Sequence, residues 1–573
     1  MTNRWPTWLE DRVPGVLRIK RLPRQLLRRN PFAGGEILPT RVPLFAPGSG
    51  RPTLPFPHPW NYREPLQILA TYHWNAERET GAARHNRYLD VPGFAPVLVT
   101  RDPRVIRAIS TETGAKEGQF DRDTLPSTGI ARATGPDTLL YANGAEWKHQ
   151  KKLATPPFAR TTLFQPEQFR GFEESFRATV ADRLDLLRQK IESDGEPVRL
   201  PLESEIKAIM LELLVNNFFG ANVSYEEIRE RHVPSLERVI DHIVTDTVIN
   251  RLGLPLQFVP GFRRSITEAR KARAVFEELT DIVIATRRAK KGQWCQFRSD
   301  APDDALRSNI RVFLAGALEA TTSYASWAIA HLARHPGAQE RLYAEVRDVE
   351  EFTPEALAQA KYLNQVLDET LRLTPSLYFH PRRATVDTWL ATSNGERLFI
   401  PKGTHILLDI WHANRHEDHW GVETTGSPAD EFAPERWSEN VAELRAKHDL
   451  LHFGFGHGPR FCPGKSLGQL EVALVVGACI KLLRVEAASP QTEARAGVST
   501  KPHDGVLVDL YLRPRPAQPS PARSTAEQGE KSADRPATSS TAAPTPDQPA
   551  TPSACPFTGR TESGDSAATA ENN

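Results

Sequence analysis

The chain has 573 residues, of which 72 are Lys or Arg and 71 are Asp or Glu. This near-balance gives no support for nucleic-acid binding, and the length exceeds the roughly 250–300 residues of a single hydrophobic core. The four cysteines are too few and too scattered for a disulfide framework or a zinc site, which favours an intracellular, cytoplasmic protein. They are Cys295, Cys462, Cys479 and Cys555.

Residues 1–60 form a Pro- and Arg-rich extension with scattered tryptophans and leucines. Two interpretations stay open: a strap packed on the main domain, or a peripheral membrane contact through residues 1–30. Pro14 and Pro23 interrupt any long amphipathic helix there. No apolar run of about 18 residues predicts a membrane-spanning helix, and no secretory signal peptide is recognisable.

Residues 61–515 are predicted to form the main domain, which is mostly helical. Trp147 and Lys151 lie four residues apart in a predicted helix that ends before the proline pair 156–157, so they share one face. A long helix is predicted over 304–335, because acidic capping candidates precede it and a proline follows it.

Two charged residues of a later helix, Glu369 and Arg372, lie three residues apart and share a face. Arg382 follows ten residues after Arg372, at the start of a strand-rich stretch around 384–410. In that stretch a Pro-Lys-Gly turn at 401–403 separates two apolar runs, which predicts strands on both sides of the turn.

The segment from Phe455 to Gly464 contains three glycines and two prolines, which exclude a regular helix or strand. A helical pattern follows it over 465–483. Cys462 is therefore predicted to lie in a tight loop at the start of a helix. The helix dipole and the free backbone N–H groups at that position favour a thiolate.

Residues 516–573 form a tail of Ala, Ser, Thr, Pro, Gln, Glu and Asp, with Phe557 as its only large apolar side chain. Such a composition cannot bury enough surface to offset the entropy of ordering, so the tail is predicted to be disordered.

The cysteine loop resembles the haem-binding signature of the cytochrome P450 family. Its fixed positions are occupied by Phe455, Gly458, Arg460, Cys462 and Gly464. The resemblance implies the cytochrome P450 fold, mainly α with a smaller β-rich region. It also implies a haem b cofactor (iron protoporphyrin IX) whose iron is ligated by the Cys462 thiolate, with Gly458 in the loop and Phe455 beside the sulfur.

The same resemblance implies other cofactor-binding residues. Arg460 would pair with a haem propionate, and so would Arg382, which resembles the family's strand arginine; Arg383 is the adjacent alternative. Trp147 and Lys151 resemble the family's Trp-x-x-x-Arg/Lys helix and would approach the propionates.

Glu369 and Arg372 resemble the family's Glu-x-x-Arg motif, and the segment 432–437 resembles its Pro-Glu-Arg-Phe segment, with Trp437 in place of Phe. Arg436 would complete a Glu369–Arg372–Arg436 cluster. Because buried charges persist only when mutually satisfied, this cluster is predicted to be structural.

The middle of the 304–335 helix resembles the family's oxygen-binding helix, in which an acid and an alcohol deliver protons. In the preferred alignment the small pair is 316–317, the acid is Glu319, and Ala320 occupies the alcohol position. In the second alignment Thr321 is the alcohol, but Leu318 then replaces a glycine. A one-residue π-type bulge would also bring Thr321 to the oxygen.

The resemblance implies a monooxygenase that acts on a lipophilic small molecule. Its electrons would come from a separate donor of the ferredoxin or flavin reductase type, because the sequence shows no redox module of its own. The variable pocket would use 115–140, 215–270 and 377–379, whereas Phe218, Phe219 and Phe258 are interpreted as core. A peroxygenase or hydroperoxide-rearranging enzyme is the alternative, followed by a non-catalytic haem sensor.

Overall fold

The computed structural model describes residues 40–42, 74, 85–89, 97–114, 118–122, 134–135, 138–159, 163, 166–248, 258, 263–288 and 303–514. Only the short strand at 40–42 falls within the predicted extension, and the predicted tail lies outside the described residues. The proposed membrane contact through residues 1–30 therefore stays a prediction. Within the described ranges, no helix combines the length and apolar character needed to cross a membrane.

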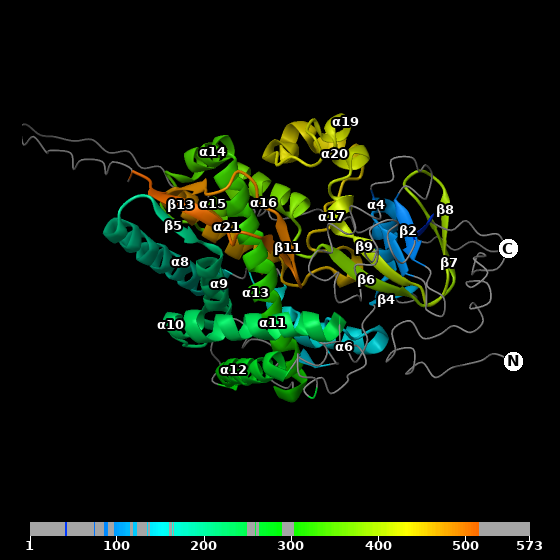
Figure 1. Cartoon of the computed structure of the whole chain (residues 1–573), viewed down its shortest axis with the longest axis horizontal. Coiled ribbons are helices and arrows are strands. Elements are labelled where there is room, and N and C mark those ends of the chain that lie inside the picture. The colour runs from blue at the N-terminus through cyan, green and yellow to red at the C-terminus, as the bar shows by residue number, and fades with distance from the viewer. Residues whose placement is uncertain are drawn as a thin grey trace, which may run out of the picture.

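The fold is mainly α with a β-rich region, as predicted. In Figure 1 the helices fill the left and centre, and the largest sheet lies on the right. The longer helices are α4 (Pro103–Glu112), α6 (Gly144–Ala154), α8 (Pro166–Asp194), α9 (Glu203–Glu212), α11 (Val233–Val248), α12 (Arg263–Arg288), α13 (Asp303–Arg334), α14 (Pro336–Val346), α16 (Lys361–Leu373) and α21 (Lys465–Leu482). Shorter helices are α10 (Tyr225–Glu227), α15 (Pro354–Gln359), α17 (Ile410–Ala413), α18 (Glu417–Trp420), α19 (Val422–Thr425) and α20 (Ala442–Lys447).

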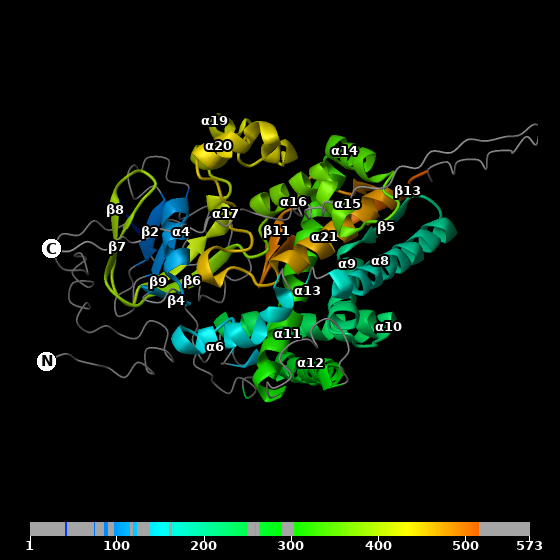
Figure 2. The same cartoon turned by 180° about the vertical axis from the view of Figure 1, so that it is seen from behind.

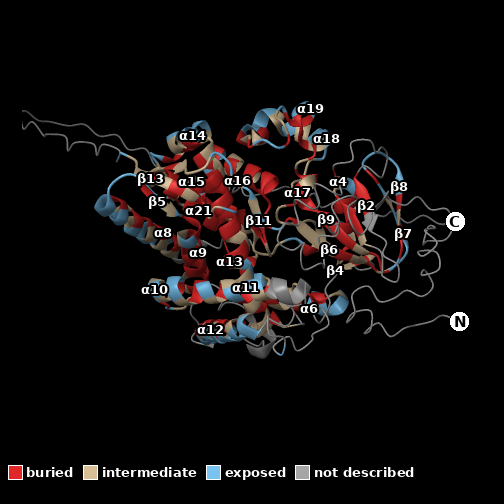
Figure 3. Cartoon of the chain, viewed as in Figure 1, coloured by how far each residue is buried: buried red, intermediate tan, exposed pale blue. Residues whose placement is uncertain are grey.

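Helices α13 and α21 form the centre of the helical part. Helix α13 packs against α9, α16 and α21, and α21 is buried over nearly its whole length. Figure 3 shows this buried interior, while α8, α10 and α12 expose their outer faces. The prediction of a helix over 304–335 is confirmed within one residue at each end.

A mixed six-stranded sheet has the order β1-β2-β3-β9-β6-β4. Its strands are β1 (Thr40–Val42), β2 (Asn86–Leu89), β3 (Val97–Thr100), β4 (Phe120–Arg122), β6 (Phe379–Ala384) and β9 (His405–Asp409). The pair β7 (Thr388–Ala391) and β8 (Arg397–Ile400) lies between β6 and β9 in the chain and confirms the predicted strand-rich stretch. Smaller sheets join β5 (Val198–Pro201), β10 (Leu483–Ala487) and β13 (Leu507–Leu512), and β11 (Ala494–Ala496) with β12 (Thr500–Pro502).

Strand register at the sheet edge next to the helices determines which charged side chains meet. Strand β4 pairs with β6 antiparallel, which places Arg122 directly opposite Arg382. Like charges at directly opposed positions repel each other and destabilise a strand pair. The view from behind in Figure 2 shows β4 and β6 side by side near α6, as the view in Figure 1 does. This pair therefore needs a compensating group.

Candidate active site

The cysteine loop is pressed against helix α4. Gly458 has a φ of 71°, and a Cβ at this position would collide with the backbone of Ser110 at the end of α4. Only glycine suits such a close approach in the left-handed region. The Cys462 N–H donates to the Phe455 carbonyl over 2.9 Å, which closes the loop on itself. The loop conformation thus follows from the glycines recognised in the sequence.

The thiol of Cys462 lies immediately before α21, as predicted. Burial raises the pKa of Cys462, whereas a hydrogen bond from the Gly464 N–H and the charges of Arg122 and Lys465 lower it. Burial outweighs these groups, so the loop alone does not produce the thiolate that the helix-start position predicts. A cation coordinated to the sulfur would supply the missing stabilisation, since a coordinating thiol is deprotonated.

Three arginines gather beside this loop: Arg382 from β6 and Arg460 from the loop itself, which are buried, and Arg122 from β4, which is partly buried. Burial is the main reason why the pKa of each guanidinium is lowered, and the neighbouring guanidinium charges lower those of Arg382 and Arg460 further. The pKa of Arg460 falls to about 9. Such a concentration of positive charge requires an anion nearby.

The hydrogen bonds of these arginines are incomplete. Arg460 Nη2 donates to the Ala142 carbonyl over 2.5 Å, but its Nε and Nη1 are buried and have no hydrogen-bond partner among the described residues. The Nε of Arg122 is also buried and also lacks a hydrogen-bond partner among the described residues. Arg382 donates over 3.2 Å to the Thr113 hydroxyl, and this acceptor carries no charge. Asp121 compensates the charge of Arg460 only in part, since the pKa of Arg460 stays lowered. The unused donors fit a ligand with carboxylates, such as the two propionates of haem.

The structure brings Trp147 and Lys151 to this cluster. The Arg460 guanidinium lies 4.3 Å from the centre of the Trp147 ring. Lys151 Nζ donates to the Pro459 carbonyl over 3.1 Å and lies 5.2 Å from the same ring. Helix α6 thus places both residues predicted from their spacing against the cysteine loop. Arg122 was missed by sequence reasoning, because a three-residue strand carries no periodic signal.

Helix α13 contains Glu319, Ala320 and Thr321 in uninterrupted α-helical conformation. The suggested π-type bulge is therefore wrong. The Thr321 hydroxyl donates within the helix to the Ala317 carbonyl, and its methyl carbon lies 3.5 Å from where a Cβ of Gly468 in α21 would lie. Because the Thr321 hydroxyl already donates to a carbonyl of its own helix, a π-type insertion would gain it no hydrogen bond.

Glu319 is held by groups from outside its helix. Its carboxylate lies 2.7 Å from Lys501 Nζ and accepts a hydrogen bond from the Ser499 hydroxyl over 2.5 Å. Burial opposes ionisation, but the charge and the hydrogen bonds of these neighbours outweigh it, so the pKa of Glu319 lies below its usual value. Glu319 is thus an ionised carboxylate that is already paired with Lys501 and Ser499.

One face of α13 remains partly accessible although the helix runs through the core. Phe313, Gly316, Ala317, Ala320 and Thr321 are not fully buried, and their spacing puts them on a single helix face. A Cβ at Gly316 would meet nothing within 4 Å. This face therefore has room for a molecule beside it.

The predicted Glu369–Arg372–Arg436 cluster is confirmed. Arg372 makes two hydrogen bonds to the Glu369 carboxylate, at 2.8 and 2.7 Å, and Arg436 Nε donates to it over 3.2 Å. Trp437, which replaces the family's Phe, donates its indole N–H to the same carboxylate over 2.9 Å. The three charged side chains are fully buried.

The aromatic residues considered for the substrate region have different surroundings. Phe218 and Phe219 are buried in the helical core and contact each other, as interpreted from the sequence. Phe258 is 79% exposed, so its interpretation as core is wrong. Tyr378 is buried and donates to the Gly497 carbonyl over 3.0 Å, whereas the adjacent Leu377 is 41% exposed.

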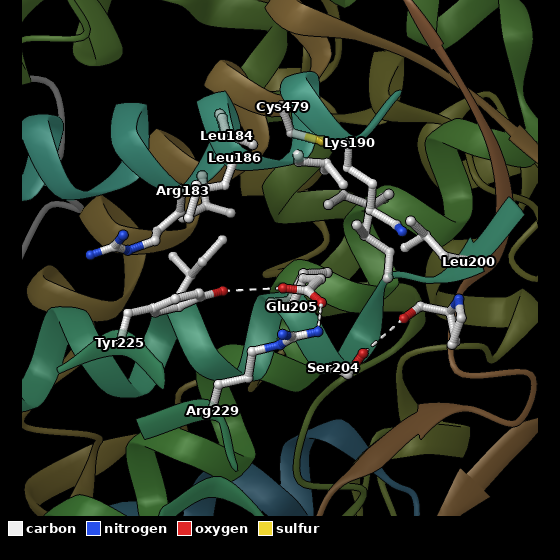
Figure 4. A pocket seen from close by; sticks show the side chains of 17 residues that line it. Arg183, Leu184, Leu186, Lys190, Leu200, Ser204, Glu205, Tyr225, Arg229 and Cys479 are labelled. Carbon is white, nitrogen blue, oxygen red and sulfur yellow. Dashed lines mark hydrogen bonds and ion pairs between the residues drawn. The ribbon is translucent and has the colours of Figure 1, made fainter. Parts of the chain in front are cut away.

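A pocket shown in Figure 4 lies elsewhere, between α8, α9, α10 and α21. Its lining includes Cys479, which is about 21 Å along α21 from the helix start beside Cys462. Its charged rim is mutually satisfied, because Glu205 accepts hydrogen bonds from both Tyr225 and Arg229. The pocket is thus separate from the cysteine loop.

Comparison with known proteins decides the family. The family described as Cytochrome P450 matches residues 91–507. The chain belongs to the cytochrome P450 family. Cytochrome P450 52A6 from Candida tropicalis is 31% identical over 458 residues, which cover 71% of this chain and 79% of that protein. Cytochrome P450 734A6 from Oryza sativa subsp. japonica is 27% identical over 455 residues, which cover 74% and 78%.

Membership establishes the general activity and the cofactor. Cytochromes P450 are haem-thiolate monooxygenases, so this chain is an oxidoreductase that uses haem b with a cysteine thiolate as the iron ligand. The buried arginines with unused donors and the helix face with free space are consistent with such a cofactor between β6, α13 and the cysteine loop.

Proposed function

We propose that this cytochrome P450 inserts one oxygen atom from O₂ into a lipophilic small molecule, with electrons from a separate donor of the ferredoxin or flavin reductase type. Cys462 is the proposed iron ligand, and the haem it holds supplies the oxidising chemistry. The observation that carries the proposal is the set of unused buried donors on Arg122 and Arg460 beside this cysteine.

The residues around the loop have proposed positioning roles. Arg122, Arg382 and Arg460 bind the propionates, because all three carry positive charge and Arg122 and Arg460 have free donor atoms. Trp147 and Lys151 hold the Arg460 guanidinium and the loop backbone in place. Gly458 allows the loop to approach α4, and Phe455 closes it through its carbonyl.

A lipophilic substrate is supported by the apolar groups near α13. The Ser376 hydroxyl donates to the Ala320 carbonyl over 3.0 Å, so the segment that carries Leu377 lies directly beside the accessible face of α13. Leu377 is 41% exposed there, and Phe313, Ala317 and Ala320 are only partly buried. Pockets for small molecules are mostly apolar with few polar groups.

The test is an absorbance titration of the ferric holoenzyme with fatty acids, terpenoids, steroids and small aromatics. A ligand that converts the haem from low to high spin identifies the substrate class, and its oxidation with ¹⁸O₂, NADPH and a surrogate reductase tests oxygen insertion. Leu377→Gln should weaken this ligand about tenfold through lost apolar contact. Leu186→Gln is the matched control, because Leu186 is 48% exposed in the pocket of Figure 4. Product without ¹⁸O would contradict the proposal.

Peroxide-driven chemistry is a second candidate, favoured by the proton-relay residues. Ala320 has no hydroxyl, Thr321 donates its hydroxyl within the helix, and Glu319 is engaged by Lys501. The acid at 319 and the alcohol at 321 are thus both engaged elsewhere and do not form a proton-delivery pair in this conformation. Turnover with hydrogen peroxide or a lipid hydroperoxide, but not with oxygen and reductase, would establish this candidate.

Ala320→Thr separates the two candidates. If oxygen and electrons drive the reaction, the added hydroxyl should raise product formed per electron consumed several-fold. Ala320→Val is the control, because it adds the shape of threonine without the hydroxyl. Unchanged coupling in Ala320→Thr would show that proton delivery does not depend on this position.

A further inference from the structure

Three histidines come together in the fold, and one of them, His85, is far from His416 and His419 in the sequence. His85 directly precedes β2, His416 caps the start of α18, and His419 lies within α18. One ring nitrogen from each histidine lies within 4.8 Å of the other two. His85 and His416 are buried, and His419 is partly buried. No residue of this cluster belongs to the site around Cys462.

The ring geometry is close to that of imidazoles that share one ion. With metal–nitrogen distances of about 2.0–2.1 Å and tetrahedral angles, the ring centres of two histidine ligands lie about 5 Å apart. The three observed distances are 4.4 Å for His85–His416, 5.2 Å for His416–His419 and 5.7 Å for His85–His419. Small side-chain rotations would therefore complete the ligand set.

Asp418 decides which nitrogen of His416 could bind a metal. The His416 Nδ1 accepts the Asp418 N–H over 3.2 Å, so without a metal Nδ1 holds a lone pair and Nε2 carries the proton. For Nε2 to bind a metal, the proton must move to Nδ1, and the Asp418 carboxylate, 3.9 Å from Nδ1, is the acceptor available for it. His416 and His419 are brought onto one side by the short helix, in which both Trp420 and His419 donate to the His416 carbonyl.

We propose that His85, His416 and His419 bind a divalent transition-metal ion, with Zn²⁺ the foremost candidate. Neutral imidazoles are preferred ligands for Zn²⁺, Ni²⁺ and Cu²⁺, whereas Mg²⁺ and Ca²⁺ prefer oxygen. Three histidines leave a fourth position for water. The ion would link the start of β2 in the large sheet to α18, both labelled in Figure 3. His85 and His416 are 331 residues apart in the sequence.

The test uses the haem-loaded enzyme after chelator treatment and titrates it with Zn²⁺ against a chromophoric chelator. We expect one ion per chain with an affinity on the order of micromolar or tighter. His416→Gln and His419→Gln should each weaken it by at least about 100-fold, more than the loss of a supporting partner costs. His149→Gln and His448→Gln are the controls, because both histidines are exposed.

Two further measurements keep the outcome decisive. The reduced, CO-bound absorbance spectrum shows whether each variant keeps its haem site and therefore its fold. X-ray absorption at the zinc edge of the wild-type protein should show three imidazoles around the ion, whatever the variants do. Absence of a site tighter than about 100 μM, or an undiminished site in both folded variants, would overturn the proposal.

Discussion

Two clusters of arginines in the interior differ in how completely their charges are paired. In the first, Arg372 and Arg436 share the Glu369 carboxylate, and backbone carbonyls accept their remaining N–H groups. In the second, Arg122 and Arg460 lower the pKa of Arg382, Arg122 lowers that of Arg460, and several donor atoms lack partners in the described part of the chain.

The difference separates a structural role from a binding role. A buried charge that is fully paired has no capacity left for a ligand, so the Glu369 cluster can only hold α16 to the segment around Arg436. A buried charge that is incompletely paired is costly unless a ligand completes it. The Arg460 cluster therefore fits a site that is finished by the cofactor's carboxylates.

The largest effect is expected from Glu369→Gln, which breaks the closed cluster. Two buried guanidinium groups then lose their counter-charge, and the free energy of unfolding should fall by about 3–5 kcal/mol. Chemical denaturation followed by circular dichroism measures this loss. Glu435→Gln is the control, because Glu435 pairs with Arg341 at the surface and should cost less than about 1 kcal/mol. Equal losses in both variants would contradict the assignment.

A smaller effect, of a different kind, is expected from Arg382→Leu in the open cluster. The variant removes one of three mutually repelling charges, so the haem-free protein should keep or gain stability. Haem should dissociate about 10- to 150-fold faster, because a hydrogen bond to a charged group contributes about 1.5–3 kcal/mol. Transfer of haem to apomyoglobin measures the rate.

The matched control is Arg383→Leu, since adjacent residues of a strand point to opposite faces and Arg383 is the alternative that the sequence left open. Faster haem loss in Arg383→Leu than in Arg382→Leu would move the role to Arg383. A haem-free Arg382→Leu protein that is clearly destabilised would show that the cluster is already satisfied without a ligand.

The sequence predicted those parts of the molecule whose residues are close together in the chain. Cys462 and Gly458 follow from one loop, and Glu369 and Arg372 from one helix turn. Arg122 could not be predicted, because it meets Arg382 only through the antiparallel register of β4 and β6. His85 and His416 likewise meet only in the folded chain.

Local rules also failed where burial competes with them. The start of α21 does favour a thiolate, through the N–H group of Gly464, yet desolvation raises the pKa of Cys462. Burial is a property of the whole fold, so neither the loop composition nor the helix dipole could give the net direction. The direction of the pKa shift of Glu319 also depends on the whole fold, because its partner Lys501 lies in β12, 182 residues away in the chain.

Glu471 in the middle of α21 shows a third way to bury an ionisable group, which is to keep it neutral. Its side chain is buried, and its Oε1 has no hydrogen-bond partner among the described residues. Burial raises the pKa of Glu471 to about 8. Between the unfolded value of 4.5 and this folded value, the folded chain holds a proton that the unfolded chain has released. Stability should therefore decrease as pH rises through this range.

Glu471→Gln should remove this pH dependence. Relative to wild type, the variant should gain stability as pH rises, by at most about 1.4 kcal/mol per pH unit and up to about 3 kcal/mol between pH 5 and pH 7.5. Urea denaturation at a series of pH values measures the difference. Glu443→Gln, at an exposed position of α20, should show no such trend. A constant difference across the pH range would mean that Glu471 is ionised in the folded protein, and that it belongs with the paired charges of the Glu369 cluster.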